Sequence, residues 1–272
     1  GAGIVAADGD RVRAPETIAF TGDSAFARVS AGEQVAVERN ASPGTTGTLE
    51  VAAGARLSGS RSITLDASKD TIVNGDLLTD NGSLSLGAAR ISLGETGGVT
   101  GGLVLSNDDL ARLNARDLVL RSRGAIDLYG ALSLDADRVA LDAAGLAGYA
   151  NSGKEVSVNA DTVTLSNRSG AGFTGTPDGT GTLTIAAREV TLGEGEFAVR
   201  GFGTTRIAGS ERIVARPEND KATALHVAGD LALETPRLTA SSGADVSIDT
   251  FDGTGATVGR ISLTAPAVTA AL

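Results

Sequence analysis

The residue types that carry out proton transfer and nucleophilic chemistry are nearly missing from this chain. His226 is the single histidine among 272 residues, and there is no cysteine. A zinc site or an activated nucleophile needs several such side chains placed together. His226 lies between Leu225 and Val227, which would face inward in a strand. We therefore expect its imidazole at the surface, without a catalytic role.

Acidic residues gather at three places, and carboxylate oxygens are the ligands that calcium prefers. The three clusters are Asp8 with Asp10, residues 107–109, and Asp135 with Asp137 and Asp142. None of them has the spacing of a known calcium-binding loop. The sequence therefore predicts no metal and no other cofactor.

Carboxylates and arginines also lie close together in the middle of the chain. Arg116, Arg121 and Arg123 are near Asp117 and Asp127. Such a set could cleave a polysaccharide if its members projected together into a groove beside aromatic sugar platforms. Aromatic residues make up only 3% of the chain, so we favour a solvated face of mixed charge and predict no enzyme. A β-helix polysaccharide lyase or glycoside hydrolase is the alternative.

The segment that shows most clearly how side chains are positioned spans residues 155–167. Val156, Val158 and Ala160 alternate with polar residues, the period of a strand with one buried face. The next apolar residue, Val163, follows Ala160 by three positions instead of two, and the alternation then resumes. A hairpin would need Asn-Gly, Asp-Gly or Gly-Gly at this point. The chain is therefore expected to turn a corner without reversing.

This strand–corner–strand pattern recurs about twelve times at a spacing of roughly 23 to 24 residues, within the range typical of solenoids. The corner position carries a small residue or Thr in every copy: Ala7, Ala31, Ala53, Ala67, Ala88, Ala115, Ala136, Ala160, Ala187, Gly209, Thr235 and Ala265. The pattern predicts an all-β chain, a right-handed parallel β-helix (β-solenoid) that forms a single elongated segment over residues 1–272. A β-sandwich of short strands is the alternative.

The aliphatic residues on both sides of the corners are expected to fill the interior. The predicted inner positions include Leu84, Leu86, Ile91, Leu93, Val156, Val158, Val163, Leu165, Leu183, Ile185, Val190 and Leu192. Outward Ser and Thr residues should align from coil to coil: Thr64, Ser85, Ser133, Ser157, Thr184 and Ser262.

The overall charge limits the possible partners. A net charge of −10 argues against a nucleic-acid surface or an anionic membrane surface. No apolar run approaches the 18 or so residues of a membrane span, so no membrane insertion is expected. The lack of cysteine suits a chain exported through an oxidising compartment.

Two Gly-rich insertions interrupt the pattern, at Ser166–Gly181 and Ser241–Gly259. They carry Phe173 with Asp178 and Phe251 with Asp252, in the related sequences T-P-D-G-T-G and T-F-D-G-T-G. Counted by the strands that follow, the insertions are about three coils apart, or roughly 15 Å. If both leave the same corner, these four residues form one lateral patch. Binding in solenoids tends to lie on such loops, so we expect this patch to contact a partner.

Three copies carry a family resemblance: L183-T-I-A-A-R-E-V-T-L-G, A224-L-H-V-A-G-D-L-A-L-E-T-P-R-L-T-A and R260-I-S-L-T-A-P-A-V. They resemble the repeat body of filamentous-haemagglutinin-like exoproteins, which are exported by two-partner secretion. The resemblance extends from about Gly47 onward and lies in repeat length, composition and alternation.

This resemblance implies an extracellular location on the surface of a Gram-negative bacterium. The implied role is structural and adhesive, in adhesion, biofilm formation or as a stalk, without catalysis. The implied partners are a host or matrix glycan or protein, or neighbouring copies of the filament. No N-P-N-G motif of the family's secretion domain is present. We therefore expect an internal segment with further coils of the parent chain at both ends.

Overall fold

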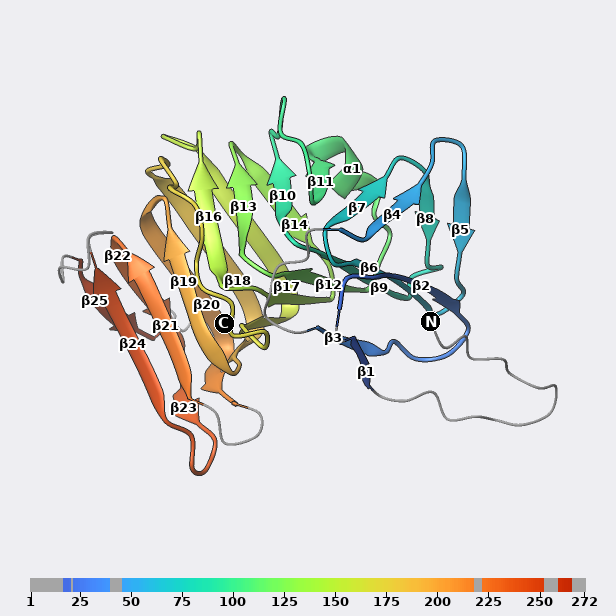
Figure 1. Ribbon diagram of the computed structural model, residues 1–272. Coiled ribbons are helices and arrows are strands. Elements are labelled where there is room, and N and C mark those ends of the chain that lie inside the picture. Colours follow the sequence, from blue (N-terminus) through green and yellow to red (C-terminus); the bar gives the residue numbers. More distant parts are fainter. Residues whose placement is uncertain (1–16, 21, 40–45, 218–221, 252–258, 266–272) are drawn as a thin grey trace, which may run out of the picture.

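The computed structural model describes residues 17–20, 22–39, 46–217, 222–251 and 259–265. Figure 1 shows most of these residues as a single stack of strands. The predicted all-β class and parallel β-solenoid are confirmed, but the solenoid has about eight turns instead of twelve.

A main sheet runs along the whole stack, and every neighbouring pair in it is parallel except β2 with β6. Its strands are β2 (Ala25–Ser30), β6 (Ser62–Ala67), β9 (Ser83–Ala88), β12 (Asp117–Ser122), β14 (Leu132–Asp135), β15 (Arg138–Asp142), β17 (Glu155–Ser166), β18 (Gly181–Leu192), β20 (Phe202–Ala215), β22 (Asp230–Glu234), β23 (Leu238–Ala240) and β25 (Ile261–Thr264).

A second, all-parallel sheet, here called the side sheet, forms another wall of the solenoid. In spatial order its strands are β11 (Leu103–Ser106), β10 (Ile91–Gly94), β13 (Ala125–Tyr129), β16 (Gly145–Tyr149), β19 (Gly195–Arg200), β21 (Thr223–Ala228) and β24 (Val246–Phe251). Three two-stranded pairs lie toward the N-terminal end: β1 (Thr17–Phe20) with β3 (Ala36–Arg39), β4 (Thr48–Val51) with β7 (Asp70–Val73), and β5 (Arg56–Ser58) with β8 (Asp76–Leu78).

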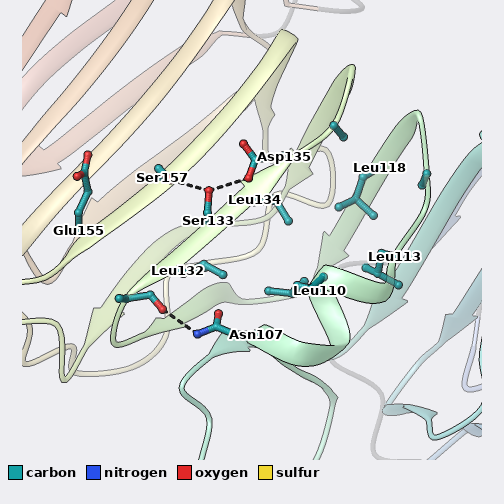
Figure 2. A pocket seen from close by; sticks show the side chains of 14 residues that line it. Asn107, Leu110, Leu113, Leu118, Leu132, Ser133, Leu134, Asp135, Glu155 and Ser157 are labelled. Carbon is teal, nitrogen blue, oxygen red and sulfur yellow. Dashed lines mark hydrogen bonds between the residues drawn. The ribbon is translucent and has the colours of Figure 1, made fainter.

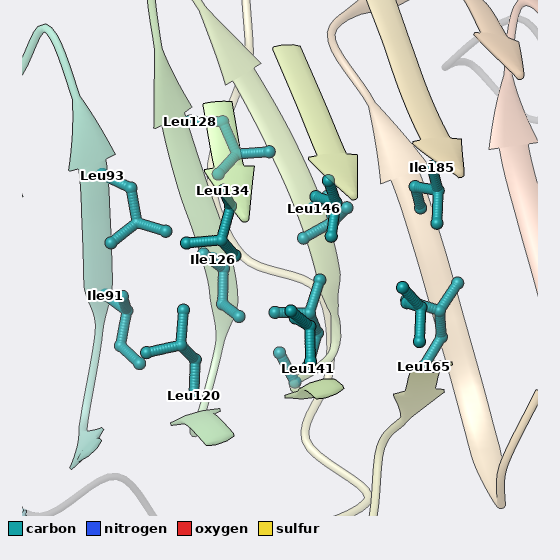
Figure 3. Close-up of a cluster of buried hydrophobic side chains, with 14 of the residues drawn as sticks. Ile91, Leu93, Leu120, Ile126, Leu128, Leu134, Leu141, Leu146, Leu165 and Ile185 are labelled. Atoms are coloured by element: carbon teal, nitrogen blue, oxygen red, sulfur yellow. The ribbon is translucent and has the colours of Figure 1, made fainter. Parts of the chain in front are cut away.

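The interior is a column of mostly aliphatic side chains (Figure 3), with Phe197 and Phe202 buried among them. All twelve inner positions predicted from the alternation are at most 2% exposed. Each large aliphatic side chain buried in this way stabilises the fold by about 1.5–3 kcal/mol. One coil alone could not offset the entropy of ordering its backbone, so the coils fold by stacking on one another.

The predicted corner is present in three consecutive long strands. β17, β18 and β20 each continue through it, and their corner residues Ala160, Ala187 and Gly209 lie in register. A Cβ on Gly209 would overlap the carbonyl oxygen of Arg212, so the corner has no room for a larger side chain there. The extra residue in the alternation therefore bends each strand without reversing its direction.

Most of the excess in the predicted coil number comes from the first three copies. The nine copies from Ser62 onward each contribute a parallel strand to the main sheet, whereas the three before it do not. Ala7 is outside the described residues. The copy around Ala31 supplies β2, which runs antiparallel to β6 and covers its edge. The copy around Ala53 supplies β4 and β5, which pair in separate small sheets.

A short helix, α1 (Asn107–Arg112), replaces the strand expected just before Ala115. Ser106 caps it, because the Ser106 side chain accepts from the Asp109 N–H and the Asp109 carboxylate accepts from the Ser106 N–H. These two bonds form a capping box. The helix leaves β14 without a strand on one side.

The N-terminal strands cover part of the outer face of the main sheet. Thr64 and Ser85 were predicted to face solvent, but they are 0% and 2% exposed. Arg39 of β3 reaches across and forms a buried ion pair with Asp66. The predicted single outward column is also wrong, because Ser85 lies opposite Val119 and does not continue to Ser133. Ser133, Ser157 and Thr184 align separately, and the Ser157 hydroxyl donates to Ser133 over 3.0 Å.

Candidate functional site

The side sheet skips one turn of the solenoid, and the candidate site lies at that point. β16 and β19 pair directly, with Gly145 opposite Ala198 and Ala147 opposite Arg200. The chain between β17 and β18, residues 167–180, contributes no strand to either sheet. The main sheet gains a strand here that the side sheet lacks.

The direct pairing of β16 with β19 depends on a glycine. A Cβ on Gly145 would overlap the backbone of Ala198, with 2.7 Å to its nitrogen and 2.6 Å to its carbonyl carbon. Gly145 also has φ +149°, a conformation open mainly to glycine. The Ala198 N–H donates to the Ala144 carbonyl over 2.9 Å and completes the junction.

The 167–180 segment lies against the side sheet and is held at its C-terminal end. The Gly179 N–H donates to the Gly148 carbonyl over 3.1 Å. Asn151 is fully buried and binds two neighbours, since its Nδ2 donates to Gly201 O and its Oδ1 accepts from the Gly181 N–H. These bonds fix where the segment crosses the side sheet.

The segment brings Phe173 to Arg200 at the end of β19. The Arg200 guanidinium carbon lies 4.6 Å from the centre of the Phe173 ring and 4.9 Å from that of Phe251. Both contacts are within the range of cation–π interactions. The structure thus brings together the two phenylalanines that sequence analysis assigned to one patch.

Two details of the predicted patch are wrong. Phe251 is the last residue of strand β24, so Ser241–Gly259 is not one continuous insertion. The V246-S-I-D-T-F alternation indicates this strand, although glycines surround it. The two rings are also closer than roughly 15 Å: both lie within 5 Å of one atom, so their centres are at most about 10 Å apart.

The two acidic members of the predicted patch have different outcomes. The Asp178 Oδ1 accepts from the Ala150 N–H over 3.2 Å, and Ala150 is in a turn with φ +47°. Asp178 therefore ties the 167–180 segment to that turn and does not line the hollow beside Arg200. Asp252 lies outside the described residues.

Arg200 was not predicted as a site residue, and His226 and Asp249 were not assigned to the patch. His226 is opposite Ala198 on one side and Asp249 on the other. Its Nδ1 lies 2.8 Å from an Asp249 carboxylate oxygen, and its side chain is 32% exposed. The expected surface position of His226 is confirmed.

These residues surround one hollow of about 520 Å³ on the side sheet. We use the name Arg200 patch for six of its lining residues: Phe173, Glu196, Arg200, His226, Asp249 and Phe251. No described carboxylate forms an ion pair with Arg200, and its buried Nε has no hydrogen-bond partner. An arginine that contacts two aromatic rings and forms no ion pair with a described residue is suited to binding a ligand.

A pair of tyrosines lies farther along the side sheet. Tyr129 and Tyr149 stack with ring centres 5.0 Å apart, and Arg90 donates to the Tyr129 hydroxyl over 3.1 Å. Burial, reinforced by the negative charge of Asp127, raises the pKa of both phenols. Burial also raises the pKa of Asp127 despite its ion pair with Arg90. Both tyrosines therefore keep their hydroxyl protons at neutral pH.

The arginine–carboxylate set in the middle of the chain forms separate ion pairs. Arg116 and Arg138 both bind Asp117, whereas Arg121 binds Asp142 at 3.0 Å. Partial burial raises the pKa of Asp117, but the hydrogen bonds from Arg138, Arg116 and Ser83 outweigh it and lower the pKa to about 2.

Arg123 is not on a solvated face, contrary to prediction. Its side chain is 5% exposed and donates to the carbonyls of Ala67 and Ser68. No three metal-ligating side chains come together within the part of the chain that the structure describes. Asp8 and Asp10 lie outside that part.

None of the described helices is long and apolar enough to span a membrane. No protein-family model, curated protein or solved structure matches the chain.

Proposed function

We propose that this chain is a structural and adhesive, non-catalytic β-solenoid segment of a large secreted surface protein of the filamentous-haemagglutinin-like type. In this proposal it acts outside a Gram-negative cell and contacts a host or matrix glycan or protein through the Arg200 patch. The observation that carries the proposal is the convergence of Phe173 and Phe251 on Arg200, which has no ion-pair partner among the described residues.

The chemistry of the patch fits a ligand with both apolar and polar faces. Aromatic rings pack against the C–H faces of sugars or against apolar side chains. Arg200 offers donors, and Asp249 and Glu196 offer acceptors, around the same hollow. Binding sites commonly combine a few directed polar groups with such apolar walls.

The direct test measures binding of the whole chain to arrays of host glycans and to immobilised matrix proteins. Arg200→Ala should reduce binding by about tenfold or more, as expected for a central arginine in an interface. Arg188→Ala is the control, because Arg188 forms an exposed ion pair with Glu211. Equal binding by the two variants would contradict the proposal.

The polysaccharide-cleaving alternative makes a different prediction. Incubation with pectins, alginate and host glycans would then release new reducing or unsaturated ends. The adhesive proposal predicts binding without any such product.

A further inference from the structure

A strand edge is left open where α1 interrupts the stack. The strands in the interior of the main sheet pair with a strand on each side. β14, in contrast, pairs only with β17. On its other side, where a strand of the preceding coil would lie, the chain forms α1. β14 therefore has one unpaired edge among the described strands.

The hydrogen bonds identify which groups this edge presents. The Ala136 N–H points toward β17, since it donates to the Asn159 carbonyl over 3.3 Å. Backbone groups of alternate residues point to opposite edges of a strand. The N–H and C=O groups of Ser133 and Asp135 are therefore directed away from β17, and both residues are exposed.

A groove of about 650 Å³ runs between this edge and α1. Leu110 and Leu113, at the end of α1, line one side, and Leu132 and Leu134 of β14 line the other. Figure 2 shows the two leucines of β14 on the opposite side of the strand from Ser133 and Asp135. The groove therefore combines apolar walls with free backbone donors and acceptors.

The charge of the groove is one-sided. Asp135 and Glu155 line it, and none of the described residues that line it is basic. The Asp135 carboxylate accepts from Ser133 and Asn159, and the Glu155 carboxylate accepts from Thr184, all of them neutral partners. Neither carboxylate forms an ion pair with a described residue, so the groove favours a basic occupant.

We propose that this groove binds an extended peptide segment with alternating apolar and basic side chains, which adds as a strand to β14. Its backbone would pair with Ser133 and Asp135, its apolar side chains would pack on α1, and its basic side chains would meet Asp135 and Glu155. Strand addition is an established way of recognising extended peptides.

The test uses a fluorescein-labelled peptide of alternating valine and lysine, titrated with the whole chain by fluorescence polarisation. Two matched peptides separate the contributions: one has glutamate in place of lysine, and one has N-methylated backbone amides. We expect binding by the lysine peptide and at least about tenfold weaker binding by the other two. Hydrogen exchange should slow at the Ser133 and Asp135 amides when the lysine peptide is added.

Variants of the chain make the test specific to this edge. Ser133→Pro removes an outward N–H without removing a bond to β17, a position where edge strands tolerate proline. It should abolish binding, whereas Ser133→Ala should retain it. Asp135→Lys places a like charge on an exposed residue, so it should weaken binding of the lysine peptide without unfolding the chain.

Three results would overturn the proposal. The lysine and glutamate peptides could bind equally, or exchange could slow at β25 while Ser133 and Asp135 stay unprotected. The peptide could also fail to bind while the chain self-associates through β14, which would assign the edge to a second copy.

Discussion

Replacing Gly145 with alanine tests the junction at which the side sheet skips a turn. The new methyl group would overlap the Ala198 backbone, and alanine would have to adopt φ near +149°. The backbone conformation costs about 1–3 kcal/mol. Relieving the overlap costs about 1–3 kcal/mol more. We expect Gly145→Ala to lower the free energy of unfolding by about 4 kcal/mol.

Two other glycines separate these contributions. Gly153 has φ +69° and open space around its Cβ position, so Gly153→Ala should cost only the backbone term of about 1–2 kcal/mol. Gly97 has open space and no positive φ, so Gly97→Ala should stay within about 0.5 kcal/mol of the wild type.

The assay is equilibrium unfolding in urea followed by circular dichroism, with hydrogen exchange at the Ala198 amide as the local measurement. Gly145→Ala should show the lowest midpoint of the three variants and faster exchange at Ala198. If Gly145→Ala matched Gly97→Ala in both measurements, the direct pairing of β16 with β19 would be refuted.

Two further predictions concern Asp117 and Ser106. The folded pKa of Asp117, about 2, is below its ordinary value of 3.8, so this carboxylate stabilises the fold above about pH 4 and loses that contribution as the pH falls toward 2. Asp117→Asn should cost about 1 kcal/mol at pH 7, after allowance for solvent screening, and nothing below pH 2 in urea titrations; a pH-independent difference would contradict this. Ser106→Ala removes the α1 cap and should cost about 1 kcal/mol, whereas Ser152→Ala, at an exposed turn, should be near neutral; equal midpoints would argue against the cap.

The parts of the fold that follow from local alternation were predictable. Spacing alone was enough to predict the inward side chains of the 155–166 strand, because side chains in a strand alternate between its two faces. These side chains are Val156, Val158, Val163 and Leu165. The corner at Ala160 was predictable in the same way, because the three-residue spacing from Ala160 to Val163 can be recognised without knowing which distant residues are in contact. These signals gave the fold class and the interior.

The missed elements depend on contacts between distant residues or on weak local signals. The pairing of Gly145 with Ala198 depends on the 167–180 segment lying outside both sheets. The spacing of apolar residues within a single strand does not indicate this. The sequence of β2 has the alternation of the other repeats, yet the strand pairs antiparallel with β6. The capping box at Ser106 was a local signal for α1 that the strand-like spacing of the next residues obscured.

The candidate site was predictable in part. Phe173 and Phe251 stand out because aromatic residues are few and both lie among glycines. Arg200 does not stand out, because its lack of an ion-pair partner among the described residues can be seen only in the three-dimensional structure. His226 and Asp249 meet because two side-sheet strands lie in register.

The most direct test of the Arg200 patch as a binding surface is the affinity of the Phe173→Ala/Phe251→Ala double variant for the glycan or matrix protein that the wild-type chain binds. Both rings contact Arg200 at the surface, away from the aliphatic interior. We expect a loss of affinity of about tenfold or more with little change in the urea midpoint. Unchanged affinity in a variant that remains folded would contradict the claim that the Arg200 patch is the binding surface.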